Sequence, residues 1–565
     1  MQKWYSKIIL ALIVALAFMI RIFMITQAPQ GAFIDEAHFG YLAYSLNETG
    51  ADEHGTPYPL LFKGFGDQKL PMGAYLMMPV VKLFGLSNAT IRYPSILAGT
   101  LLVLGMYWLT RELGFKEKWG LLAAFITAIS PWSFFLSRFG FESNLALLWF
   151  VWGLVFLMKV PHSKNWYWPV LAGLSLGLTW YSYIAYRPVT VLLAIVWLGY
   201  WWLMRAKNKS LSNLPRQTAY FALPFLLLIS VWFHPAISKA NTARLEQVGI
   251  LEDPGIVLLI DENRAFCDWR FPRQLCYAIW NKPTVIGRML FSRYLHTFSP
   301  EFLATRGEAV EEFLTVEHYG QFFHLLYPFF IIGLAFLIFS SQKEIAPSTK
   351  VLLIAGLLLA ALPGLIVGEP QKVRISALFP FIVMVMVLGV RALSQWLVPF
   401  RLQTLVIVVV VAGSLAQSAM YLIDYYGVHT VKAEFSYQSY MPELMAYVDE
   451  QVNENTLINI VPFFSDPLMF YAYYTHMNPA AYQEQAVLGE LEVSGFQHTV
   501  EIDGLWAKKM TPEEFSCQGS KKSKEKLLYI TDQTLAGYSL IKEIKATNGV
   551  HTYVKIYEVP VQACE

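Results

Sequence analysis

The sequence predicts a polytopic α-helical membrane protein that carries a small α/β domain at its C-terminal end. Of the 565 residues, 55% are hydrophobic and only 15% are charged, whereas soluble globular proteins contain about 25% charged residues. Long apolar runs recur through residues 1–424, and the tail 425–565 has a mixed composition. We therefore expect a transmembrane domain, 1–424, and a water-facing domain, 425–565. The net charge of +2 does not suggest nucleic acid as a partner.

Eleven apolar runs are long enough to cross a membrane as helices of about 20 residues. They are 8–27, 93–110, 119–137, 143–159, 166–185, 188–204, 217–236, 321–340, 351–368, 374–396 and 403–424. The first run is expected to remain as an anchor, because it is too long for a signal peptide and lacks a small-residue cleavage site.

Lysine and arginine residues in short loops indicate which side of the membrane each loop occupies. An N-terminus in the cytoplasm places inside the loops that hold Arg111, Lys116, Lys118, Lys159, Lys164, Arg205, Lys207, Lys209, Arg216, Lys343, Lys350, Arg391 and Arg401. The apolar run 70–86 carries two prolines and Lys82, and counting it as a span would reverse every later loop. We therefore expect an interfacial or re-entrant helix there, and a plasma-membrane protein with the outer segments 28–92, 237–320 and 425–565.

All four cysteines fall in the segments that this topology places outside. The outer side is oxidising, so disulfides persist there. We predict the bridges Cys267–Cys276 and Cys517–Cys564, with four unpaired thiols as the alternative.

The tail 425–565 combines helix-like and strand-like stretches. MPELMAYVDEQV has the spacing of a helix, NTLINIVPFF and KLLYIT are typical of strands, and 538–558 is predicted to form a hairpin. The tail contains no Gly-rich phosphate loop, CxxC pair or HExxH motif. These features predict a small α/β domain without chemistry of its own.

Two adjacent carboxylates, Asp35 and Glu36, follow the first span directly. From Glu36 onward, apolar residues at helical spacing suit a helix that lies on the membrane surface, at positions Phe39, Leu42, Ala43 and Leu46. Asp35 then stands at the N-terminus of this helix, where a carboxylate can cap backbone N–H groups. A carboxylate beside the bilayer can also act as a general base toward an acceptor hydroxyl or amine. Both roles can hold at once.

Several cations stand at the predicted outer ends of the spans, where the positive-inside bias does not explain them. They are Lys69, with Asp67 close to it, and Arg138, Arg187 and Arg374. Each alone could reach the membrane surface with its charged head or pair with an acid such as Glu142 or Glu369. Together they suit a lipid-linked phosphate, for which Arg and Lys are the usual ligands.

Four stretches carry a resemblance to a known superfamily: FIDEAHFGYLAYSLNETGADEHGTPYPLLFKGFGDQKLPMGAYL, RYPSILAGTLLVLGMYWLTREL, AISPWSFFLSRFGFESNLAL, and HTFSPEFLATRGE followed by GQFFHLLYPFFIIGL. They resemble the polyprenyl-phosphate-sugar glycosyltransferases of the GT-C superfamily. The protein O-mannosyltransferases and the lipid A aminoarabinose transferase are the nearest types. The resemblance covers most of 1–400 in order.

The resemblance implies a polyprenyl or dolichyl phosphate donor that carries one sugar, of hexose or pentose type. It also implies inverting transfer to a protein, lipid or glycan at the outer membrane face, with Asp35 as the base and Glu36 in support. Lys69 matches a family lysine that contacts the donor phosphate, although this chain has Lys-Leu-Pro where the family has Lys-Pro-Pro. His318 matches the histidine of a family Arg-His pair, whose arginine is replaced here by Glu317.

A phosphate leaving group needs only a base on the acceptor and cations on the departing charge. Direct displacement by the acceptor then inverts the anomeric carbon without a protein nucleophile. No cofactor or metal is required, although Asp35, Glu36 and Asp67 could hold a divalent ion. The alternatives are a transporter or flippase for lipid-linked glycans, and a ligase or polymerase that acts on them. A transporter would show ionisable residues near mid-membrane and repeat symmetry. Neither feature is evident in the sequence.

Overall fold

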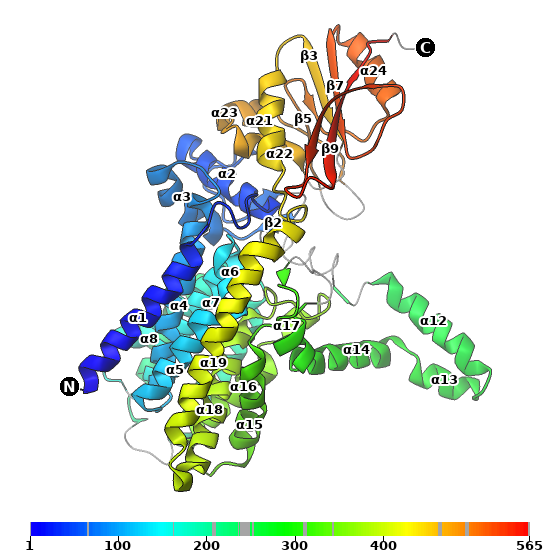
Figure 1. The fold of residues 1–565 in the computed structure, drawn as a ribbon. Coiled ribbons are helices and arrows are strands. Elements are labelled where there is room, and N and C mark those ends of the chain that lie inside the picture. Colours follow the sequence, from blue (N-terminus) through cyan, green and yellow to red (C-terminus); the bar gives the residue numbers. More distant parts are fainter. Residues whose placement is uncertain are drawn as a thin grey trace. The chain divides into compact units, whose positions relative to one another are not determined.

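The structure is a computed structural model that describes residues 2–64, 67–161, 163–205, 211–234, 237, 249–250, 253–308, 314–341, 344–461, 466–491 and 497–562. Lys207, Lys209, Lys343 and Cys564, which were named above, lie outside these residues. The chain forms two compact units (Figure 1). The helical unit comprises Met1–Arg21, Ser95–Ser137 and Glu142–Leu422, and the mixed unit comprises Ile22–Pro94, Arg138–Phe141 and Ile423–Glu565. This division differs from the predicted one because the first outer segment joins the C-terminal tail.

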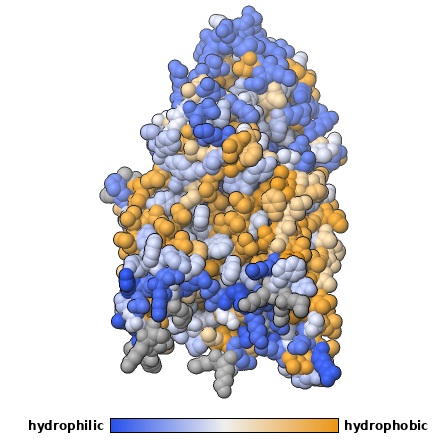
Figure 2. Space-filling view, turned by 90° about the vertical axis from the view of Figure 1, so that its left-hand side faces the viewer, coloured by the Kyte–Doolittle hydropathy of each residue, from blue (hydrophilic) through white to orange (hydrophobic). Residues whose placement is uncertain are grey.

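The helical unit contains eight helices that are long and apolar enough to cross a membrane, counted over the described residues. They are built from α1 Gln2–Ile22, α4 Tyr93–Glu112, α7 Glu142–Lys159, α9 Tyr186–Arg205, α10 Leu214–Ser230, α16 Pro347–Leu359 with α17 Leu362–Leu365, α18 Phe379–Trp396 and α19 Gln403–Asp424. A ninth span results if α5 Glu117–Ile129 and α6 Pro131–Arg138, which meet at a 53° bend, are counted as one. The space-filling view shows apolar side chains gathered in a band over this unit (Figure 2).

The predicted number of eleven spans is not confirmed. The predicted spans 166–185 and 321–340 contain the shorter helices α8 Tyr167–Leu178 and α15 Tyr327–Phe339. Helix α15 packs closely on α18, where Gly333 and Gly389 face the opposite backbone. A Cβ atom at Gly333 would lie 1.9 Å from the Val385 carbonyl oxygen. Small residues at such contacts allow apolar helices to approach closely.

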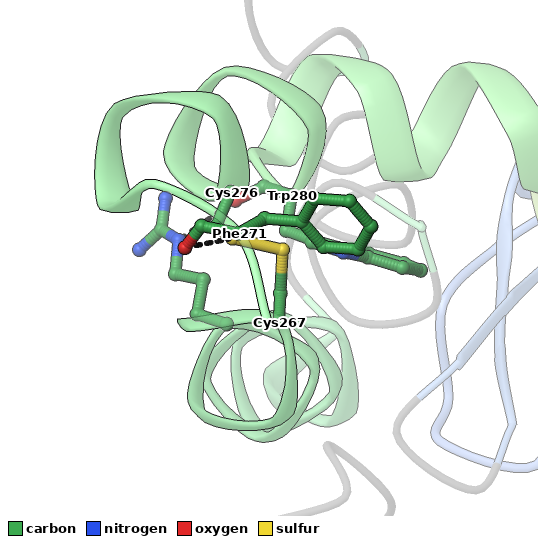
Figure 3. The surroundings of a disulfide bond; sticks show 5 residues. Cys267, Phe271, Cys276 and Trp280 are labelled. Atoms are coloured by element: carbon green, nitrogen blue, oxygen red, sulfur yellow. Dashed lines mark hydrogen bonds between the residues drawn. A yellow bond between two sulfur atoms is a disulfide. The ribbon is translucent and has the colours of Figure 1, made fainter. Parts of the chain in front are cut away.

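Three helices between the span α10 and the shorter helix α15 form an arm of the helical unit. They are α12 Pro254–Asp268, α13 Arg273–Ile279 and α14 Lys282–Thr297. The predicted bridge between Cys267 and Cys276 is confirmed and joins α12 to α13 (Figure 3). Cys517 is also disulfide-bonded, and its predicted partner Cys564 lies outside the described residues.

Short helical turns connect these elements. They are η1 Thr90–Arg92, η2 Thr179–Tyr181, η4 Val231–Phe233, η5 Glu301–Thr305, η7 His324–Leu326, η8 Ser376–Leu378, η9 Val398–Phe400, η10 Tyr425–His429 and α20 Thr430–Lys432.

The C-terminal tail folds as the predicted α/β domain. Its helices are α21 Met441–Gln451, α22 Pro467–Tyr474, α23 Pro479–Gln485 and α24 Pro512–Lys521, and its strands are β3 Thr456–Ile460, β4 Val487–Leu488, β5 Thr499–Ile502, β6 Leu505–Trp506, β7 Lys526–Thr531, β8 Ser539–Lys545 and β9 Thr552–Val559. The strands form a sheet in the order β4-β5-β6-β3-β7-β9-β8, in which β3 runs parallel to β6 and β7. Because side chains alternate along a strand, Ile458 and Ile460 contact the core on the α21 and α22 face. Leu457 packs with Phe515 of α24 on the other face.

The first outer segment supplies α2 Ile34–Thr49, a hairpin of β1 Phe62–Gly64 and β2 Asp67–Lys69, and α3 Met72–Phe84. The prediction that α2 lies on the membrane surface is wrong. Most of α2 is buried, and it packs against both α3 and α22 in the same hydrophobic core as the sheet. Small residues make this possible, since a Cβ atom at Gly40 would lie 2.8 Å from side chains of Ile91 and Tyr473.

Candidate active site

The N-terminus of α2 places Asp35 and Glu36 in the first helical turn. Phe33 occupies the N-cap position with an extended backbone, and its N–H donates to Oε2 of Glu36 over 3.1 Å. The predicted capping role of Asp35 is therefore wrong, because the carboxylate that satisfies the free backbone N–H is that of Glu36.

Glu36 is fully buried in an ion pair with Arg92. Its side chain is 1% exposed and that of Arg92 is 0% exposed. Oε1 accepts from Nε of Arg92 at 3.0 Å and from the backbone N–H of Gly140 at 2.8 Å. Oε2 accepts from Nη2 of Arg92 at 3.0 Å. With the bond from Phe33, this carboxylate accepts four hydrogen bonds and cannot receive a substrate proton without breaking one of them.

Arg92 was not predicted as part of the site. Its remaining N–H groups donate to the carbonyl oxygens of Ile25, Pro29 and Gly31 over 2.9, 3.0 and 2.6 Å. Arg92 therefore ties the chain that leaves the first span to the start of α2. The only sequence signal was its place in the Arg-Tyr-Pro stretch that contributed to the family resemblance.

Arg138 has a similar structural role, which corrects its predicted place among the donor-phosphate ligands. Its side chain is fully buried. The guanidinium donates to the carbonyl oxygens of Phe23, Met24 and Ala28 and lies over the rings of Tyr425 and Tyr426. A phosphate could reach it only by displacing this backbone, so Arg138 holds the segment after the first span in place.

Asp35 and Lys69 form an ion pair at the edge of the mixed unit. The Asp35 side chain is 35% exposed and that of Lys69 is 9% exposed. The hairpin positions Lys69 by pairing it with Phe62, and its ammonium lies 5.6 Å from the centre of the Phe39 ring on α2. Asp67 begins β2, and its side chain lies outside the described part of the structure. The structure thus brings the predicted base and the predicted phosphate ligand together.

A second buried pair lies further along α2. His38 Nε2 is 2.6 Å from Oε1 of Glu53, and both side chains are almost completely buried. Burial alone would raise the pKa of Glu53, but the charge and hydrogen bond of His38 outweigh burial and lower that pKa. The two residues line a cavity of about 410 Å³ together with Gln68, Asp466 and Tyr482, among others. Sequence reasoning did not identify this cavity, because its walls come from segments about 400 residues apart.

The other predicted site residues belong to the helical unit. Arg187 lies 4.1 Å from the ring centre of Trp232 and donates to the Trp180 carbonyl oxygen at 3.3 Å. The guanidinium of Arg374 is half-buried and, within the described residues, makes no hydrogen bond or ion pair. His318 is 85% exposed and lies 3.7 Å from Glu317, which replaced the family arginine.

Two predicted acids also fall in the helical unit. Glu142 is the first residue of α7. Glu369 accepts from Arg293 at 3.3 Å. The predicted meeting of Lys69 with Arg374 at one phosphate stays a prediction. Over the described residues, no group of three His, Cys, Asp or Glu side chains is arranged to hold a metal ion.

Comparisons with known proteins identify relatives of the chain. Residues 11–241 match the family model of dolichyl-phosphate-mannose-protein mannosyltransferases, which covers less than half of the chain. No protein of curated function matches the sequence.

The structure is similar to ArnT from Cupriavidus metallidurans in the apo state, with a TM-score of 0.52 and 10% identity over 100% of this chain and 99% of that chain. The same enzyme bound to undecaprenyl phosphate gives a TM-score of 0.51 and 12% identity, covering 98% of each chain. A further similar structure is that of the oligosaccharyltransferase AglB from Archaeoglobus fulgidus in complex with an inhibitory peptide and a dolichol-phosphate. It has a TM-score of 0.49 and 14% identity, and the match covers 94% of this chain and 69% of that chain. The chain therefore has the fold of a GT-C membrane glycosyltransferase, as the resemblance in its sequence predicted.

Proposed function

We propose that the protein is an inverting glycosyltransferase that moves one sugar from a polyprenyl-phosphate donor to an acceptor at the outer face of the plasma membrane. The acceptor is a hydroxyl or amine of a protein, lipid or glycan. The observation that carries this proposal is the contrast between two neighbouring carboxylates. Glu36 is buried and accepts four hydrogen bonds, whereas Asp35 is partly open and lies beside a cation.

Asp35 takes the role of general base in this reaction. The acceptor oxygen or nitrogen attacks the anomeric carbon while the bond from that carbon to the phosphate oxygen breaks. The acceptor proton passes to the Asp35 carboxylate, and the polyprenyl phosphate leaves with the bonding electrons. Because attack and departure occur on opposite sides of one carbon, the configuration is inverted. Glu36 positions Asp35 by fixing the first turn of α2 to Arg92.

The Lys69–Asp35 ion pair suggests how donor binding prepares the base. Without the donor, the Lys69 ammonium neutralises Asp35. A donor phosphate competes for the same ammonium, since both partners bind it through charge-assisted hydrogen bonds. When Lys69 turns to the phosphate, Asp35 is released to accept a proton. In the helical unit, Arg374 and Arg187 are further candidate phosphate ligands, and Arg374 is the stronger because it has no partner within the described residues.

The test uses the purified full chain in lipid nanodiscs with radiolabelled undecaprenyl-phosphate mannose, glucose and aminoarabinose, and a membrane extract as the acceptor source. We expect transfer of at least one sugar. Asp35→Asn should reduce turnover by about 10²–10⁴-fold, the usual contribution of a general base, while the melting temperature stays near that of the wild type. Glu48→Gln is the matched control, because Glu48 is exposed on the same helix and should leave turnover unchanged. Full turnover in Asp35→Asn, or retention of the anomeric configuration in the product, would overturn the proposal.

A further inference from the structure

The arm α12–α14 exposes an apolar surface that no described part of the helical unit covers. Leu258 and Phe266 of α12 are 72% and 70% exposed, and Trp269, just after this helix, is 89% exposed. Phe271 and Leu275 continue the surface toward α13. Soluble proteins rarely leave such a continuous apolar patch open to water.

The arm is a preformed structure with its own small core. Ile256 and Ile260 of α12 pack against Val285 and Ile286 of α14. The disulfide Cys267–Cys276 closes the eight-residue loop 268–275 at the far end, which we call the tip (Figure 3). The exposed aromatic residues are therefore held outward by a folded scaffold.

The side chain of Arg264 forms a second connection between the two ends of the tip. Its Nε donates to the carbonyl oxygen of Trp280 at 2.7 Å, and its guanidinium lies 4.2 Å from the ring centre of Tyr277. This side chain therefore joins α12 to the segment that leads into α14.

The base of the arm is attached at the end of a membrane span. The backbone N–H of Ile250 donates to the carbonyl oxygen of Ile366 at 3.0 Å, and Arg293 donates to that of Leu365 at 3.1 Å. Leu365 is the last residue of the span Pro347–Leu365, whose other end carries Lys350. The arm is therefore attached beside the C-terminal end of this candidate span.

The charges of the arm suit phosphate headgroups. Residues 254–297 contain six basic and three acidic side chains. Two of the basic ones, Arg270 and Arg273, alternate with Trp269 and Phe271 in the tip. Exposed tryptophan, phenylalanine and arginine are the residues that settle at the boundary between lipid headgroups and acyl chains.

We propose that the tip is a membrane anchor: Trp269 and Phe271 insert into the headgroup region of the outer leaflet, and Arg270 and Arg273 bind lipid phosphates. The anchor fixes the arm against the bilayer from which a lipid-linked substrate would arrive. This inference depends on the membrane spans and not on the proposed reaction.

The test places a genetically encoded nitroxide side chain at position 269 or 271 of the full chain in nanodiscs, so that both cysteines remain in their disulfide. Position 513, exposed on α24, is the water-facing control. We expect collisions with oxygen to exceed collisions with a water-soluble nickel chelate at 269 and 271, and the reverse at 513. Values at 269 and 271 that equal those at 513 would overturn the proposal. Shielding from both reagents would also overturn it, because it would show a protein partner on the tip.

The arginines are tested by changing the lipids. Raising the share of phosphatidylglycerol in a phosphatidylcholine nanodisc should increase the depth at which the nitroxide at position 269 lies in the bilayer. This shift should disappear in Arg270→Gln/Arg273→Gln. A depth that is independent of phosphatidylglycerol in the otherwise unchanged protein would refute the phosphate contacts. Mass spectrometry of the intact disulfide and a thermal melt check that each variant is folded.

Discussion

The buried Glu36–Arg92 pair offers a sharp test of how the first turn of α2 is held. Glu36→Gln keeps the shape of the side chain but removes its charge. Only one oxygen remains to accept, so two of the four donors now face an NH₂ group. Arg92, with no exposed surface, is left without its counter-charge.

The expected loss follows from this geometry. Removing one partner of a buried ion pair costs about 3–5 kcal/mol. In a unit of roughly 150–250 residues, each 1 kcal/mol lowers the melting temperature by about 2–4 °C. We therefore expect the melting temperature of the mixed unit to fall by about 6–20 °C in Glu36→Gln.

A second substitution distinguishes the cost of an unpaired buried charge from the cost of a changed side-chain shape. Arg92→Met also strands a buried charge, that of Glu36, and removes the donors to three carbonyl oxygens. The double variant Glu36→Gln/Arg92→Met buries no net charge, so its loss should be at least about 2 kcal/mol smaller than the sum of the two single losses. The assay is thermal unfolding of the full chain in nanodiscs, followed by circular dichroism. A melting temperature of Glu36→Gln within 2 °C of the wild type, or additive losses, would refute the reasoning.

Three further predictions concern the mixed unit. Lys69→Met should lower turnover with a polyprenyl-phosphate sugar by about 10²-fold or more, since a phosphate-binding donor is lost, while Lys69→Arg should keep part of it in the same radiolabel assay. Gly64→Ala places a Cβ atom 2.2 Å from the ring of buried His38, so a thermal melt should show a loss of about 1–3 kcal/mol. Burial raises the pKa of Glu501, but hydrogen bonds from lysines such as Lys508 outweigh burial and lower it to about 2. Because this value lies below the unfolded value of about 4.3, Glu501 stabilises the folded state above that pH. The contribution disappears as the pH falls toward 2. Glu501→Gln should therefore lower the melting temperature at pH 7 and leave it unchanged near pH 2.

Much of the fold was predictable because it depends on local composition. Apolar runs of about 20 residues identify spans, and short runs rich in apolar and β-branched residues identify strands such as β3 and β7. The tail 425–565 and the bridge Cys267–Cys276 follow from the same kind of reasoning. The span 166–185 could not be resolved in this way, because hydropathy does not show that α8 ends at Leu178 and continues as a short turn.

The candidate site was predictable only in part. Asp35 and Lys69 were recognised through the resemblance of the first outer segment, and their ion pair depends on a hairpin of two three-residue strands that is too short to identify from its residues. Arg92 was missed because a basic residue beside a span is normally a topology signal. Arg138 was misassigned for a related reason, since nothing in its local sequence shows that three carbonyl oxygens surround it.

The placement of α2 depends on residues that lie about 400 positions away. The hydroxyl of Tyr474 accepts from the backbone N–H of Ala32 at 3.0 Å, immediately before the helix begins. Further along α2, Tyr41 donates to the carbonyl oxygen of Met477 at 3.0 Å. Both contacts come from the tail, whose own sequence shows no chemistry.

Adjacent residues on a helix point about 100° apart, so two neighbouring carboxylates at the end of one helix can have different surroundings. The side toward Arg92 buries Glu36 in its ion pair. The side toward Lys69 leaves Asp35 partly open. Because the tail anchors α2 through Tyr474, it also maintains this difference. The C-terminal domain therefore contributes to the proposed reaction by fixing which of the two carboxylates remains available to take a proton.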